Sequence, residues 1–308
     1  MEKKAISLAC RMDSERAINL TKKVFEFLVK KGEVVYLETR ISPKILPHSG
    51  KDLSEMNAQN TKFIISIGGD GTILRVANSL PQVNPPPILG VNIGSLGFLD
   101  ESNERTIFND LRRALKEEYI LERCSKIAAY IIRNNEEHKL DNALNEILII
   151  SSKSTKVLLV SVKVDGVFLN RSYLDGVIVS TSTGSTAYNL SAGGSIVNAS
   201  LDIMQLTPLN SFAQSGLKPI ILPIESEVEI KLLRHRLDAD VVIDGQKSFR
   251  NVSPNTVIKI RKANAYCNFI RFSRSLSDNY FRRLRKKIIG TIRVPLDDSP
   301  EEDFNSHY

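Results

Sequence analysis

The residues best suited to chemistry form a short glycine-rich turn that contains a single carboxylate, Gly68-Gly69-Asp70-Gly71-Thr72. The turn follows an apolar, β-branched run at 63–67 and precedes a run with helical character at 73–78. A strand, a glycine turn and a helix N-terminus in succession present backbone N–H groups to a phosphate. We therefore predict that Gly68, Gly69, Gly71 and Thr72 form a phosphate-binding turn.

Asp70 is the unexpected member of this turn, because a carboxylate repels phosphate unless it has a chemical role. Two such roles are known for aspartate at phosphoryl-transfer sites. It can accept the proton of an attacking hydroxyl, or it can hold Mg²⁺. The alternative is a residue that only shapes the turn or caps the helix, since aspartate and glycine are common turn formers.

Two better-known glycine loops are absent from the sequence. No GxxxxGK[ST] segment occurs, which excludes a P-loop nucleotide site. No GxGxxG segment opens a helix after the first predicted strand, which gives a Rossmann dehydrogenase little support.

Two further turns carry polar or aromatic side chains. The segment 90–99 follows a predicted strand and contains three glycines and Phe98, which either stacks on a base or belongs to the core. The segment 174–194 leads from a strand into a turn rich in serine and threonine. Short hydroxyl side chains and backbone amides can bind ribose, amide and phosphate oxygens, although a surface loop has a similar composition.

The first 120 residues must position the first two turns, and they alternate between strand and helix signals. This alternation is typical of an α/β fold with a parallel sheet. We predict a first helix that Asp13 or Ser14 caps and Gly32 ends, and a later helix at 103–117. The predicted strands lie at 5–9, 34–37, 63–67 and 88–91.

From about residue 121 the sequence predicts strands with few helices between them, and Asp165-Gly166 predicts a tight hairpin. We therefore expect an α/β domain at 1–121, joined by 272–290, and a β-rich domain at 122–271. Residues 277–287 have helical character, and the acidic, polar stretch 291–308 is expected to be disordered. The predicted strands of the second domain lie at 126–133, 144–151, 157–164, 176–181, 227–233, 241–243 and 256–261.

Composition narrows the class of protein. No apolar run reaches the roughly 20 residues of a membrane-spanning helix, so we expect a cytoplasmic protein with no membrane partner. The three cysteines are far apart and suit a reducing compartment. The net charge is +7, and much of the excess lies at 271–287. Without a zinc finger or RNP aromatics we expect no nucleic-acid partner, and we interpret the late basic helix as facing solvent or the first domain.

Taken together, the motifs resemble those of the NAD kinase family. They are GGDGT at 68–72, NxGxLGF at 92–98, Asn145-Glu146 and DGVIVSTxTGSTAYxLSAGG at 175–194, in the family's order. The resemblance covers residues 62–250. Lipid kinases share GGDGT and phosphofructokinases carry a variant of it, whereas TGSTAY together with the Asn-Glu pair is specific to the family.

The resemblance implies phosphorylation of the adenosine ribose 2′-hydroxyl of NAD to give NADP. ATP or polyphosphate would be the donor, with Mg²⁺ or another divalent metal carried on the phosphates and no metal ligands expected from the protein. Asp70 would be the general base, and the glycine turn would lie near the donor phosphates. The implied NAD-binding residues are Phe98, Asn145, Glu146, Asp175, Thr186, Ala187, Tyr188, Ser191 and Asp244.

The resemblance also implies a terminal helix that returns to the first domain, and a homodimer or homotetramer in which a neighbouring subunit completes the NAD site. One position departs from the family, because Ser182 replaces the proline of STPTGST, and we expect a looser turn there. Two other functions stay open: a lipid kinase of the diacylglycerol or sphingosine kinase type, and a non-catalytic dinucleotide sensor.

Overall fold

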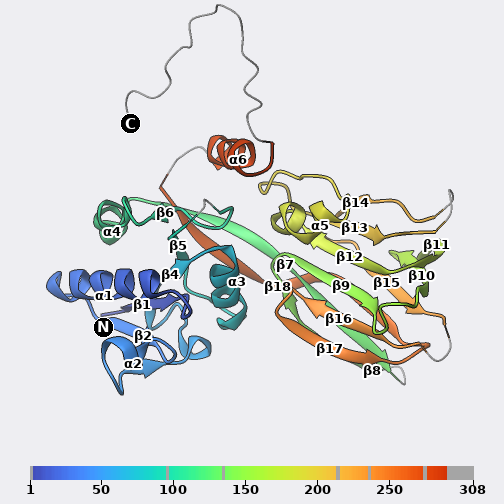
Figure 1. The fold of residues 1–308 in the computed structure, drawn as a ribbon, viewed down its shortest axis with the longest axis horizontal. Coiled ribbons are helices and arrows are strands. Elements are labelled where there is room, and N and C mark those ends of the chain that lie inside the picture. Colours follow the sequence, from blue (N-terminus) through green and yellow to red (C-terminus); the bar gives the residue numbers. More distant parts are fainter. Residues whose placement is uncertain are drawn as a thin grey trace, which may run out of the picture.

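The computed structural model describes residues 3–94, 97–133, 136–212, 216–234, 237–272 and 276–289. Two β-sheets of twelve and six strands organise the chain, and helices cover the part of the large sheet formed by the first half of the sequence (Figure 1).

The first half forms a parallel sheet in the order β5-β4-β1-β2-β3, with the short strand β6 paired to β5. Every residue of β1 and β5 is buried, as expected for strands of a parallel sheet with both faces covered. The strands are β1 (Ala5–Cys10), β2 (Val35–Glu38), β3 (Gly50–Lys51), β4 (Thr61–Gly68), β5 (Ile88–Asn92) and β6 (Ser102–Asn103).

The helices of this half follow the predicted signals. The first helix begins after Ser14, whose hydroxyl accepts a hydrogen bond from the Ala17 N–H, and it stops before Gly32, which has a φ of +72°. A 3₁₀ turn spans Leu53–Glu55. The helices are α1 (Glu15–Lys30), α2 (Ser42–Ile45), α3 (Asp70–Ser79) and α4 (Ile107–Leu115).

Two long strands join the halves of the molecule, β7 (Ile120–Arg133) and β18 (Val257–Arg271) (Figure 1). They pair antiparallel with each other, and Phe269 of β18 also pairs in parallel with Ile88 of β5. The large sheet is therefore continuous, and the expected domain boundary at 121 falls inside β7. The same sheet includes β8 (Glu136–Ala143), β10 (Leu158–Val164), β11 (Val167–Leu174) and β15 (Val228–Leu232).

The six-stranded sheet packs against this extension of the large sheet. Their shared core includes Ile127, Ile149, Val160, Val179, Ile230 and Ile258, all buried. The turn between β10 and β11 has positive φ angles at Asp165 and Gly166, as the hairpin prediction requires. The strands of the smaller sheet are β9 (Glu146–Ser151), β12 (Gly176–Thr181), β13 (Ile203–Leu209), β14 (Ile220–Pro223), β16 (Ala239–Ile243) and β17 (Lys247–Val252).

The predicted fold class, an α/β half with a parallel sheet followed by a β-rich half, is confirmed. A helix near the C-terminus, α6 (Leu276–Leu284), continues into a π-helical turn at Arg285–Ile289. This segment contacts the first half through Arg283, which donates to the Phe98 carbonyl at 2.7 Å. The stretch 291–308, expected to be disordered, lies outside the described residues. None of the helices that the structure describes is long and apolar enough to cross a membrane.

Candidate active site

Asp70 is the first residue of α3, and its carboxylate points toward the segment that follows β5. Its Oδ2 accepts a hydrogen bond from the Phe98 N–H at 2.9 Å, and its Oδ1 accepts one from the Leu99 N–H at 3.0 Å. Gly69, not Asp70, is the N-cap of α3. The side chain is therefore aimed into the space between two turns, away from the end of its own helix.

The second glycine turn closes over this carboxylate. A Cβ atom at Gly97 would overlap Oδ1 of Asp70, so only glycine lets the chain pass this close. The Gly97 N–H donates to Asp100 Oδ2 at 2.6 Å, and the Asn92 amide donates to the same oxygen at 2.6 Å. Gly97, Phe98 and Leu99 thus fix the position of Asp70.

The phosphate turn lies at the carboxyl edge of the parallel sheet, where Gly68 ends β4. A Cβ atom at Gly68 would overlap the Thr72 side chain. Gly69, Gly71 and Thr72 line a cavity of about 410 Å³ together with residues that follow β1 and β2. Three of the four predicted phosphate-binding residues therefore line one cavity. The fourth, Gly68, packs against the Thr72 side chain.

Asn145 and Glu146 lie at the start of β9, and Asp244 holds them there. The Asp244 carboxylate accepts hydrogen bonds from the backbone N–H groups of Leu144, Asn145 and Glu146 at 2.8, 2.8 and 3.0 Å. The Asn78 amide of α3 donates to it at 2.7 Å. Four hydrogen bonds from the protein thus engage the carboxylate of Asp244, a predicted NAD-binding residue. Through them Asp244 connects α3 to the start of β9.

Glu146 itself is buried, with 6% of its surface exposed. Its Oε2 atom has no hydrogen-bond partner among the described residues. Burial raises the pKa of Glu146 to about 8, and the nearby Asp244 carboxylate adds to the increase. The side chain is therefore largely protonated at pH 7, and its Oε2 atom is free to donate or accept a hydrogen bond.

The TGST turn packs directly on the Asn-Glu pair. The Thr181 N–H donates to the Asn145 carbonyl at 2.8 Å, and a Cβ atom at Gly184 would overlap the Asn145 backbone. The turn continues as a 3₁₀ turn (Thr183–Thr186) and α5 (Tyr188–Ser191). Thr186 and Ala187 lie at the end of the 3₁₀ turn, whereas Tyr188 and Ser191 are exposed on α5.

Ser182 takes the conformation that proline would impose at its position. Its φ is −58°, close to the value that a proline ring fixes. Its hydroxyl donates to the Leu201 carbonyl, a bond that proline lacks. The expectation of a looser turn is not supported, because this hydrogen bond replaces the constraint of the ring.

Asp175 lies away from the other predicted residues. It precedes β12, whereas the TGST turn follows it, and six strand residues separate the two by roughly 20 Å. The Asp175 carboxylate accepts a hydrogen bond from the Asn210 amide at 2.8 Å. Within one chain, Asp175 therefore does not join Phe98, Asn145 and Thr186.

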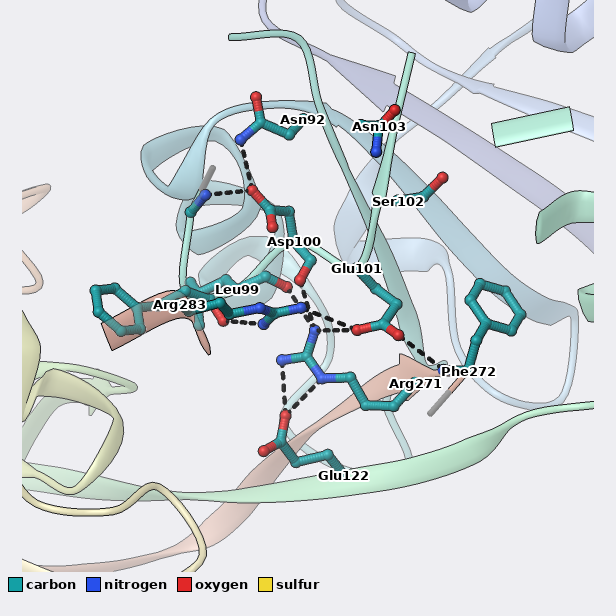
Figure 2. A network of polar contacts seen from close by, with 12 residues as sticks. Asn92, Leu99, Asp100, Glu101, Ser102, Asn103, Glu122, Arg271, Phe272 and Arg283 are labelled. Carbon is teal, nitrogen blue, oxygen red and sulfur yellow. Dashed lines mark hydrogen bonds and ion pairs between the residues drawn. The ribbon is translucent and has the colours of Figure 1, made fainter. Parts of the chain in front are cut away.

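A buried charged network that the sequence did not predict lies behind the Phe98 turn (Figure 2). Arg271, the last residue of β18, contacts the Glu122 carboxylate at 2.7 Å and donates to the Asp100 carbonyl at 2.8 Å. Glu101 accepts from the Arg283 guanidinium at 2.9 Å. The side chains of Arg271 and Arg283 are only 5% and 12% exposed, and Arg283 faces the first half, which is one of the two orientations expected for the late basic helix. Arg282 is exposed, as expected.

The C-terminal segment covers the same turn. The Lys287 ammonium lies 3.0 Å from Asp70 Oδ2 and 5.1 Å from the centre of the Phe98 ring. The Tyr280 hydroxyl donates to the Val197 carbonyl at 2.8 Å. A small cavity of about 40 Å³ remains between this segment and the TGST turn, lined in part by Phe98, Thr186 and Tyr280. Phe98 and Thr186, two predicted NAD-binding residues that are 88 positions apart in the sequence, therefore line one cavity.

No group of three or more His, Cys, Asp or Glu side chains suited to a metal ion occurs among the described residues. The side-chain oxygens of the residues that line the larger cavity belong to the Asp13 carboxylate and the Thr72 hydroxyl. Such a sparse donor set fits Mg²⁺, which is usually held by one or two carboxylates together with substrate phosphates.

Comparison with known proteins agrees with this arrangement. Residues 6–119 match the model of the ATP-NAD kinase N-terminal domain, and residues 144–272 match that of the C-terminal domain. The NAD kinase of Thermococcus gammatolerans is 36% identical over 280 residues, which are 91% of this chain and 98% of that protein. The NAD kinase of Methanothermobacter thermautotrophicus is 32% identical over 286 residues, 92% and 96% of the two chains.

Solved structures show the same fold. The yeast NADH kinase complexed with NADH superimposes with a TM-score of 0.80 at 20% identity, and the match covers 97% of this chain and 91% of that one. An NAD kinase from Archaeoglobus fulgidus in complex with ATP gives a TM-score of 0.70 at 28% identity, with 92% and 98% covered. The chain belongs to the NAD kinase family.

Proposed function

We propose that this protein transfers the terminal phosphoryl group of ATP to the adenosine ribose 2′-hydroxyl of NAD, giving NADP, with Asp70 as general base. One observation carries the proposal. The Asp70 carboxylate is fixed by the amides of Phe98 and Leu99, and its neighbours Gly69 and Gly71 line the cavity of the phosphate turn. The relatives named NAD kinase, and the ATP in the Archaeoglobus structure, support the choice of acceptor and donor.

The reaction follows from this position. The ribose oxygen forms a bond to the terminal phosphorus, and the bond between that phosphorus and the bridging oxygen of the donor breaks, so that ADP leaves. The proton of the hydroxyl passes to Asp70 as the new bond forms. The two backbone amides hold the carboxylate without side-chain rotation, which keeps the base within reach of a hydroxyl placed roughly 3 Å from phosphorus.

In this proposal Mg²⁺ enters the site bound to the phosphates of ATP or polyphosphate. Mg²⁺ on the phosphates neutralises their charge when it is bound, and Thr72 and Asp13 are the side-chain oxygens of the donor cavity that are available to it. Polyphosphate presents the same phosphoanhydride to Asp70, so we include it as a second donor. The cysteines are all free and buried, which supports a reducing, cytoplasmic setting.

The acceptor site combines residues from both halves of the molecule. Phe98 lies beside the adenine, and Asn145 and Glu146 bind the adenosine with Thr186 and Ala187 next to them. Asp244 acts by holding the Asn145-Glu146 backbone in place. Asp175 serves the NAD site of a neighbouring subunit, which requires a homodimer or homotetramer. Tyr188 and Ser191 are exposed on α5, where they can contact the part of NAD that extends from the TGST turn toward solvent.

A polar acceptor is favoured over a lipid because hydroxyl side chains gather where the acceptor would bind. Ser182, Thr183 and Thr186 line the cavity next to Phe98. A lipid kinase needs an apolar pocket for its acceptor, and a wall with three hydroxyl side chains does not provide one.

Incubation with NAD and a panel of phosphate donors, with and without Mg²⁺, tests the proposal by the NADP formed. A parallel reaction replaces NAD with diacylglycerol or sphingosine. NADP formation with ATP and Mg²⁺ is the expected result. Phosphorylation of the lipid alone would establish the lipid kinase, and calorimetric NAD binding without any NADP would establish the sensor.

A further inference from the structure

The strand order of the parallel sheet places a crevice beside the phosphate turn. From β1 the chain continues to β2 on one side, and it later returns to β4 on the other side before reaching β5. The order therefore reverses between β1 and β4. In open α/β sheets, ligands bind outside the carboxyl ends of the strands at such a reversal.

The residue that follows β1 meets the phosphate turn at this point. Cys10 pairs with Ile67, and the Arg11 N–H donates to the Ile67 carbonyl at 2.9 Å. Arg11 therefore lies next to the start of the Gly68–Thr72 turn. Arg40 reaches the same edge of the sheet two residues after the end of β2. Both arginines line the cavity of about 410 Å³ that Gly69, Gly71 and Thr72 also line.

The charges around this cavity do not cancel. Its third arginine, Arg75, is held by the buried Glu38 carboxylate at 2.5 and 2.8 Å. Arg11 pairs with Asp13 at 2.7 and 2.9 Å. No carboxylate lies within 4 Å of the Arg40 guanidinium in the part of the chain that the structure describes. In the described part of the chain, Arg40 is thus an exposed arginine without a counter-ion, and it lines the same cavity as the phosphate turn. Arg11 is paired there only with the exposed Asp13.

We propose that Arg40 and Arg11 bind the phosphate chain of the leaving group, so that the donor runs from Asp70 across the turn to the β1–β2 edge. This inference rests on the proposed function for the identity of the donor. The ligand class is a linear phosphate chain, whether the β- and α-phosphates of ATP or inorganic polyphosphate. Guanidinium groups form paired, charge-assisted hydrogen bonds with phosphate oxygens, which a chain of this kind presents along its whole length.

The test compares Arg40→Ala, Arg11→Ala and Arg40→Lys with the unmodified protein. Lys23→Ala is the matched control, because it removes one positive charge from the exposed face of α1 in the same half of the molecule. Two readouts are used: the KM values for ATP, for inorganic tripolyphosphate or longer polyphosphate, and for NAD; and calorimetric binding of MgATP and of tripolyphosphate. Circular dichroism checks that each variant is folded.

We expect Arg40→Ala to raise the KM for ATP about tenfold or more and Arg11→Ala to raise it by a smaller factor, because Asp13 already engages Arg11. The KM for NAD and kcat change less than threefold, since donor binding is lost equally in the ground and transition states. Arg40→Lys recovers part of the affinity because its charge remains. Lys23→Ala behaves as the unmodified protein.

Unchanged donor affinity in Arg40→Ala and Arg11→Ala would overturn the inference. An effect on ATP without an effect on tripolyphosphate would also overturn it, because the arginines would then contact the nucleoside. Absence of NADP formation by the unmodified protein would instead refute the proposed function. In that case calorimetry with tripolyphosphate still decides whether the two arginines bind a phosphate chain.

Discussion

The ammonium group of Lys287 lies 3.0 Å from Oδ2 of Asp70, so the helical segment near the C-terminus forms an ion pair with the proposed base. Both side chains are about one-third exposed. The same ammonium lies over the Phe98 ring, beside which the adenine is proposed to bind. We therefore expect NAD to displace Lys287, and Lys287→Met should lower the KM for NAD by up to about fivefold, the equivalent of the ~1 kcal/mol of a partly exposed ion pair.

Lys286→Met is the matched control for this substitution, because Lys286 is the exposed neighbour in the same turn. Steady-state kinetics with NAD as the varied substrate measure the difference. An increase in the KM for NAD in Lys287→Met would show that the lysine assists NAD binding, contrary to the displacement that the ion pair implies.

Gly97→Ala should lower kcat by about 10- to 100-fold. The added Cβ atom would overlap Asp70 Oδ1, so the 97–99 backbone must move away from the carboxylate that it positions. Displacement of a catalytic group by about 1 Å costs up to ~100-fold in rate. Gly94→Ala is the control in the same turn, since its Cβ would meet no atom closer than 4.0 Å. Equal kcat values for the two variants would contradict the role given to Gly97.

The raised pKa of Glu146 predicts how the stability of the protein depends on pH. Its pKa in the folded state is about 8, mainly because of burial, against 4.5 as the ordinary value. Between these two values the folded state holds a proton that the unfolded state has lost, so this group reduces stability as pH rises from 4.5 to 8. Below pH 4.5 and above pH 8 the two states bind equal numbers of protons, and the dependence ends.

Glu146→Gln removes this dependence. The Tm difference between variant and unmodified protein should shift in favour of the variant from pH 5 to pH 9, as measured by thermal unfolding at each pH. Glu26→Gln, an exposed carboxylate on α1, provides a control with a constant difference. A constant difference for Glu146→Gln as well would show that Glu146 ionises normally in the folded protein.

Arg271→Met should destabilise the fold by about 3–5 kcal/mol, because it removes the buried cation that pairs with Glu122 and leaves Glu101 with Arg283 alone. Arg123→Ala removes an exposed arginine of β7 that stacks on Tyr266, and it should cost at most about 1 kcal/mol. Urea unfolding measures both. Similar values would show that the buried network contributes no more than a surface contact.

The sequence predicted elements whose hydrophobic pattern is continuous. The strand at Gly176–Thr181 is entirely buried, and its predicted bounds are those observed. The strand Glu136–Ala143, which pairs with β7, was missed. Its own first four residues are polar and exposed, so they carry no apolar signal. The strand Ile203–Leu209 was missed because Gln205, Thr207 and Pro208 interrupt its apolar pattern.

The site was predictable where a motif holds its own residues together, as in the Gly68–Thr72 turn. Contacts that depend on tertiary pairing were not. Arg271 follows the buried pair Phe269-Ile270 at the end of a strand, and this apolar context was the only signal that it would be buried. Nothing local to Asp244 indicates that its carboxylate binds three backbone amides 98–100 residues away.

Turnover of Asp70→Asn tests the account most directly. The asparagine keeps one oxygen for the Phe98 or Leu99 amide but cannot accept the proton. We expect kcat for NADP formation to fall by about 10²–10⁴-fold, while calorimetric NAD binding stays within about threefold of that of the unmodified protein. Asp165→Asn, a conservative change in the distant β10–β11 turn, should keep full activity. Normal turnover by Asp70→Asn would contradict the assignment of Asp70 as the base.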